Sequence, residues 1–177
     1  MLSFPELTCV MGDEDTEPIA VERINYFEDF SEGQTFEHHW GRTINEGDNS
    51  VFSTLMMNAN PSHFNADYAG ELGYDREVVN PMLAFNVVFG MSVQDLSEAG
   101  GAFLGIENLE FHETVYPGDT LYADSEVLNK RESSSRPHQG IVHWYTKGTR
   151  PDGELVLEYE RKNLIARRNP PEEAESE

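Results

Sequence analysis

Residues 57–69 read Met-Asn-Ala-Asn-Pro-Ser-His-Phe-Asn-Ala-Asp-Tyr-Ala, and this stretch decides how the rest of the chain is arranged. Pro61 fixes its own φ and disfavours a helical conformation for the residue before it, so a helix cannot continue through this point. The apolar helical run over residues 51–56 is therefore expected to end near Asn58. His63 comes just after the break, in an exposed position of the kind that often lines a cleft. The stretch predicts a loop that presents a histidine to a site.

Short elements are predicted on both sides of this loop. A strand is expected over residues 35–42, although its alternation of apolar and polar residues is imperfect. Thr43 or Asn45 can cap the helix that leads into the loop, because both side chains can accept a hydrogen bond from a free backbone N–H. A second short helix is expected over residues 66–72, and Gly73 ends it.

The most apolar segment covers residues 82–95 and predicts a buried helix of about four turns. Pro81 suits its first turn, and Gln94-Asp95 mark the return of polar residues at its end. A helix that is apolar on nearly all sides must be wrapped by other elements. The remaining sequence supplies only strands, which are predicted at residues 102–113, 120–132, 140–149 and 154–166. Long antiparallel strands around one central helix describe a single hot-dog fold of the α+β class.

The domain is expected to cover residues 25–168. Residues 1–24 form an acidic N-terminal arm with little periodicity, and residues 169–177 form an acidic tail that is expected to be disordered. The short apolar run near the N-terminus is interrupted and lies close to acidic residues, so neither a signal peptide nor a membrane span is predicted. We therefore expect a soluble, cytoplasmic protein.

The chain is strongly acidic, with 12 Lys and Arg against 33 Asp and Glu and a formal net charge of −21. Such a charge repels phosphate backbones, which makes nucleic acid an unfavourable partner. Two explanations stay open: the acidity belongs to the two tails, or it is spread over the body as an adaptation to a salt-rich cytoplasm that screens charge.

Metal binding and disulfide formation have little support in the sequence. Cys9 is the only cysteine, so no intrachain disulfide can form and no thiolate metal cage is available. No histidine pair or carboxylate-flanked histidine has the spacing of a zinc site, so no metal is expected. The other histidines are interpreted as surface or core packing residues; they are His38, His39, His112, His138 and His143.

The pattern Asn58-x-Asn60-Pro61-x-His63, followed by Asn65 and Tyr68-Ala69, resembles the D-x-N-P-x-H and D-x-x-Y-A signature of MaoC-like (R)-specific enoyl-CoA hydratases. The resemblance extends from residue 26 to residue 167. Residues 130–133 and 135–137, together with Met-Asn-x-Asn-Pro-x-His-Phe, are most similar to the mesaconyl-CoA hydratase (β-methylmalyl-CoA dehydratase) branch. The chain has Asn58 and Asn65 where the family signature has aspartates.

The resemblance implies a hot-dog hydro-lyase that reversibly hydrates a 2-enoyl-CoA without a cofactor. His63 would move the proton and Asn58 would orient the water. Asn60 is a candidate for substrate binding, although its side chain is better suited to bonding the loop backbone beside Pro61. Because an amide cannot act as a general base, three alternatives stay open. His63 acts alone, a carboxylate enters the cleft, or hydration has been lost. The carboxylates considered are Glu46, Asp48 and Asp67.

Two further groups are candidates for substrate binding. The start of the central helix would polarise the thioester carbonyl, through the backbone N–H of Met82 or Leu83 or through the side-chain amide of Asn80. Pro81 stands where the family has a glycine, and it has no N–H to donate. Arg131 and Arg136 could bind the CoA phosphates or a free carboxylate of the acyl group, or they could be solvated charges on a hairpin.

The sequence is also compatible with two other functions: a hot-dog acyl-CoA thioesterase and a non-catalytic acyl-CoA-binding subunit. A lone hot-dog domain would leave a sheet edge unpaired. We therefore expect a homodimer or a higher homo-oligomer in which sheets join.

Overall fold

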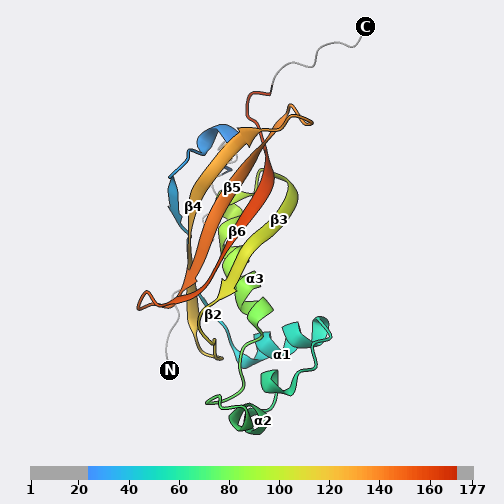
Figure 1. The fold of residues 1–177 in the computed structure, drawn as a ribbon, viewed down its shortest axis with the longest axis vertical. Coiled ribbons are helices and arrows are strands. Elements are labelled where there is room, and N and C mark those ends of the chain that lie inside the picture. Colours follow the sequence, from blue (N-terminus) through green and yellow to red (C-terminus); the bar gives the residue numbers. More distant parts are fainter. Residues whose placement is uncertain (1–23, 171–177) are drawn as a thin grey trace, which may run out of the picture.

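The computed structural model describes residues 24–170 as one curved antiparallel sheet around a long helix (Figure 1). The strands follow the order β1-β4-β5-β6-β3, with β2 paired to β4 at one end. Their bounds are β1 Thr35–Glu37, β2 Arg42–Thr43, β3 Gly100–Phe111, β4 Thr120–Glu132, β5 Gln139–Thr149 and β6 Leu155–Ala166. The predicted α+β hot-dog fold is confirmed.

The central helix α3, Pro81–Leu96, lies against the inner face of the sheet (Figure 1). Leu83, Phe85 and Val88 are buried in a core that continues into the strands. Gly148 on β5 allows the closest approach, because a Cβ at this position would lie 2.5 Å from a methyl group of Val88. The expectation that strands wrap this helix is confirmed, and the observed helix begins one residue earlier and ends one residue later than predicted.

The polar loop belongs to a separate corner at one end of the sheet, below the start of α3 in Figure 1. Three short helices build it: α1 Glu46–Leu55, the 3-10 helix η2 Pro61–His63, and α2 Ala66–Glu71. Asn45, one of the two predicted caps, accepts a hydrogen bond from Asp48 N. The breaks near Asn58 and at Gly73 lie where the sequence predicts them.

The predicted strand over residues 35–42 is wrong as a single element. It is divided into β1 and β2, and Trp40 between them adopts a positive φ of 66°. Gly41 follows, where a Cβ would lie 2.6 Å from the ring of Tyr122, so the backbone passes close to β4 at this point. A local alternation pattern could not show this bend, because its cause is a contact with a distant strand.

Residues 1–23 and 171–177 lie outside the described residues, so the predicted acidic arm and most of the predicted tail do too. The expected domain limits at residues 25 and 168 stay predictions. No helix within residues 24–170 is long and apolar enough to cross a membrane.

Candidate active site

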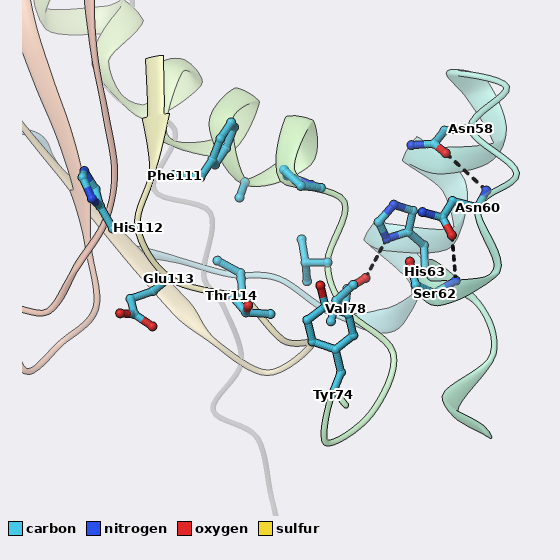
Figure 2. A pocket seen from close by; sticks show the side chains of 14 residues that line it. Asn58, Asn60, Ser62, His63, Tyr74, Val78, Phe111, His112, Glu113 and Thr114 are labelled. Atoms are coloured by element: carbon cyan, nitrogen blue, oxygen red, sulfur yellow. Dashed lines mark hydrogen bonds between the residues drawn. The ribbon is translucent and has the colours of Figure 1, made fainter. Parts of the chain in front are cut away.

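A cavity of about 480 Å³ opens where the corner meets the first turn of α3 (Figure 2). The 3-10 helix η2 and the loop before it supply Asn58, Asn60 and His63. Pro81 and Ala84 of α3 form a second wall, and residues 111–115, which comprise the last residue of β3 and the segment after it, form a third. The structure therefore brings together the polar loop and the helix start that the sequence placed in one site.

His63 is one of the residues that line this cavity. It is 5% exposed rather than lying in the open loop that the sequence suggested. Its Nδ1 lies 3.0 Å from the carbonyl oxygen of Val78. Because a carbonyl can only accept a hydrogen bond, this contact places the proton of the neutral ring on Nδ1 and leaves a lone pair on Nε2. Figure 2 shows the ring between Val78 and the two asparagines, so Nε2 can take a proton from a group in the cavity.

Asn49 holds this histidine in place, and the sequence analysis missed it. The side chain is 1% exposed. Its amide nitrogen donates to the carbonyls of His63 at 3.1 Å and of Val78 at 3.0 Å, and its oxygen accepts from Asn80 N at 2.8 Å. One buried amide therefore links α1, η2 and the start of α3. The signal that could have revealed it is a polar residue on the face of α1 that carries Phe52 and Ser53.

Asn58 and Asn60 shape the loop through their side-chain oxygens. Asn58 Oδ1 accepts from Asn60 N at 3.2 Å, and Asn60 Oδ1 accepts from Ser62 N at 3.2 Å (Figure 2). The Asn58 oxygen, which was expected to orient water, is thus already engaged, although it keeps a second lone pair. Both amide nitrogens can still donate toward the cavity.

The donors expected at the start of α3 all have partners within the protein. Met82 N donates to Asn80 Oδ1 at 3.0 Å, and Leu83 N donates to Asn80 O at 2.8 Å. The Asn80 amide nitrogen donates to Ser53 Oγ at 3.2 Å. A thioester oxygen could use the N–H of Met82 or Leu83 only by replacing an existing hydrogen bond, and Pro81 has no N–H to offer. The Asn80 amide has a second N–H, but Asn80 is not part of the cavity wall.

The remaining candidates do not line the cavity. Arg131 and Arg136 lie at the hairpin between β4 and β5, at the opposite end of the sheet from the corner (Figure 1). None of the three carboxylates considered is part of the cavity wall. Glu113, Thr114 and Tyr74 are part of it, and no sequence pattern had indicated these three. His112, which was interpreted as a packing residue, also lines the cavity.

Comparison with known proteins gives the family. A family model described as mesaconyl-CoA hydratase matches residues 13–176. The chain belongs to the mesaconyl-CoA hydratase family. The predicted resemblance to this branch of MaoC-like hydratases is thereby confirmed.

Two curated members of the mesaconyl-CoA hydratase family illustrate the similarity. A mesaconyl-CoA hydratase from Haloarcula hispanica is 39% identical over 150 residues, which cover 84% of this chain and 42% of the relative. A β-methylmalyl-CoA dehydratase from Chloroflexus aurantiacus is 36% identical over 146 residues, covering 82% of this chain and 41% of the relative. The chain therefore spans less than half the length of these relatives.

Solved structures extend the comparison to three dimensions. A MaoC domain protein dehydratase from Chloroflexus aurantiacus superposes with a TM-score of 0.78 at 34% identity, covering 86% of this chain and 44% of that chain. A Mycobacterium tuberculosis protein described as a double hot-dog fold superposes with a TM-score of 0.76 at 25% identity, covering 83% of this chain and 46% of that chain. This member of the mesaconyl-CoA hydratase family thus matches less than half of each of these two longer chains.

Proposed function

We propose that this protein reversibly hydrates a 2-enoyl-CoA, and that His63 moves the proton. The observation that carries the proposal is the buried imidazole with Nδ1 bound to the Val78 carbonyl and Nε2 open to the cavity. The names of the curated relatives favour mesaconyl-CoA or β-methylmalyl-CoA as the substrate pair.

In the proposed mechanism, a water molecule lies between His63 Nε2 and the side-chain amide of Asn58. His63 takes one proton from the water while the water oxygen bonds to C3 of the enoyl group. The double-bond electrons move to form an enolate on the thioester, and His63 then returns the proton to C2. Water is thereby added on one face. The chain and the water supply every group in this scheme, so no cofactor is proposed.

The enolate oxygen needs a hydrogen-bond donor at the moment when charge develops. The donors at the start of α3 are occupied, so the proposal assigns this role to Tyr74, whose side chain reaches toward Val78 in Figure 2. Its hydroxyl has no hydrogen-bond partner within residues 24–170. Asn60 offers its free amide nitrogen as a second donor.

We also propose that the protein acts as a homodimer in the cytoplasm, where CoA esters are used. The relatives are about twice as long, and the described sheet ends in β3, which carries exposed Phe103, Leu104 and Phe111. An exposed apolar edge strand favours pairing with a second copy. Light scattering at working concentration tests this proposal, and a monomer would contradict it.

A panel of enoyl-CoA esters, including crotonyl-CoA and mesaconyl-CoA, tests the activity. Hydration removes the conjugated double bond, so its ultraviolet absorbance should fall, and the assay should be run in high salt because of the net charge of −21. Release of free thiol without this loss would indicate a thioesterase. Tight binding without either change would indicate a binding subunit.

A further inference from the structure

Arg161 on β6 is a buried cation without a counter-ion. Its side chain points toward α3 and is 0% exposed. Within residues 24–170 its only hydrogen bond is a long one, from Nη2 to Ser92 O at 3.4 Å. Nε and Nη1 are buried without a partner, and no carboxylate in this part of the chain forms an ion pair with the guanidinium.

The aromatic rings around Arg161 stabilise its positive charge but do not provide an anion. The guanidinium carbon lies over the rings of Phe89 at 4.7 Å and Trp144 at 5.2 Å. These contacts are attractive for a cation but do not satisfy N–H donors. Trp144, the cross-strand neighbour of Arg161, has a buried indole N–H that also lacks a partner in the described chain. The unpaired donors of both residues point to an acceptor that carries negative charge.

An uncompensated charge in this position is costly. Burial lowers the pKa of Arg161 to about 10, which still leaves the group charged near neutral pH. Buried charges in proteins are normally paired, because transfer of an unpaired ion from water is strongly unfavourable. The cost falls when an anion accepts hydrogen bonds from the unpaired Nε and Nη1, since a guanidinium can hold two oxygens in a bidentate geometry.

We propose that Arg161 binds a carboxylate group between β6 and α3. The carboxylate comes either from the far end of a dicarboxylic acyl group or from a free small carboxylate. The first source rests on the proposed function: in the described chain no lysine or arginine lines the catalytic cavity, although the acyl groups named for the relatives are dicarboxylic.

Arg161 lies further along α3 than the cavity, because it contacts Phe89 and Ser92. Ala84 lines the cavity, and Phe89 lies about 7.5 Å further along the same helix at 1.5 Å per residue. The rings of Phe85 and Tyr159, with centroids 5.1 Å apart, belong to the buried core around this helix.

The test uses Arg161→Met, which replaces the cation with an apolar side chain of similar length. Such replacements of buried charges are often neutral or stabilising, so the variant should fold. Arg161→Lys keeps the charge but loses the bidentate geometry and serves as a second variant. Arg42→Met is the control, because Arg42 is an exposed residue paired with Asp48.

The first arm compares hydration of mesaconyl-CoA and crotonyl-CoA. If the acyl carboxylate is the ligand, the ratio of kcat/KM for mesaconyl-CoA to that for crotonyl-CoA should fall at least about tenfold in Arg161→Met, because a charge-assisted hydrogen bond is lost. Arg42→Met should keep the wild-type ratio. Arg161→Lys should lie between the two.

The second arm measures the unfolding temperature against sodium acetate at constant ionic strength. If a free carboxylate is the ligand, acetate should raise the unfolding temperature of the wild type and of Arg42→Met but not that of Arg161→Met. This arm needs no enzymatic activity, so it remains decisive if no enoyl-CoA is hydrated and the proposed function fails. An unchanged substrate ratio together with the same acetate response in all variants would overturn the proposal for Arg161.

Discussion

His63 and His38 are buried to nearly the same extent, 5% and 4% exposed, but their ring nitrogens are used differently. His38 bonds at both: Nδ1 lies 2.7 Å from Asp95 Oδ2, and Nε2 lies 2.8 Å from Ser125 Oγ. His63 bonds only through Nδ1 and leaves Nε2 to the cavity. Burial therefore does not distinguish a histidine that can transfer a proton to a ligand from a histidine with a structural role. The distinguishing property is a ring nitrogen that the protein leaves open to a cavity.

The largest expected effect comes from removing the open nitrogen. His63→Ala should lower kcat/KM for enoyl-CoA hydration by about 10³-fold, the usual contribution of a general acid or base. The measurement is the loss of double-bond absorbance, with circular dichroism to show that the fold is retained. His38→Gln is the matched control, and a His63→Ala variant that keeps its activity would remove the central assignment.

A smaller loss is expected when the support of His63 is removed. Asn49→Ala leaves the carbonyls of His63 and Val78 and the N–H of Asn80 without their shared partner. We expect a stability loss of about 1–3 kcal/mol, from denaturant unfolding, because buried polar groups lose their hydrogen bonds. Activity should fall about 10- to 100-fold as the imidazole loses its fixed orientation.

The experiment on Asn49 has a sharp control. Asn45→Ala removes an exposed cap of the same helix, which bonds only to Asp48. It should cost about 1 kcal/mol of stability and leave the activity close to wild type. Equal activity losses in the two variants would show that general weakening of α1, and not the hydrogen bonds to Val78 and Asn80, causes the effect.

The two histidines also differ in what the sequence could reveal. The polar loop, the central helix and the four long strands were predictable because Pro61, Pro81 and apolar periodicity act over a few residues. The contacts that leave a ring nitrogen of His63 available for proton transfer were not predictable. Val78 supplies a backbone carbonyl, which leaves no trace in residue type, and Asn49 reaches it from 29 positions away. The occupied donors at the start of α3 were missed for the same reason. Asn80 is a polar residue in the sequence whether its side chain faces a substrate or bonds to the backbone of α3.

A third experiment tests the structural role of His38 through pH. Burial lowers its pKa below the ordinary value of 6.5, although the bond to Asp95 opposes the shift. The unfolded chain then binds more protons than the folded one as pH falls below 6.5, so folding stability should decrease in that direction. The unfolding temperature of the wild type should drop by a few degrees more than that of His38→Gln between pH 8 and pH 5.5. If the unfolding temperatures of the two proteins fall equally with pH, His38 does not cause the loss of stability.

The smallest effect is expected when the family's carboxylate is restored beside the open nitrogen of His63. Asn58→Asp keeps the oxygen that accepts from Asn60 N, so the loop should retain its shape. A carboxylate can accept a proton where the amide cannot, so kcat should rise a few-fold if proton transfer limits the reaction. The pH profile of kcat should also gain an acidic inflection near the ordinary Asp pKa of about 3.9.

The control is Asn65→Asp, at the other position where the chain departs from the family signature. Asn65 caps α2 outside the cavity wall, so this variant should give neither change. If Asn58→Asp instead abolishes activity, the amide nitrogen of Asn58 must donate a hydrogen bond that the reaction needs, and its role would be to hold the water or the thioester rather than to stand in for a base.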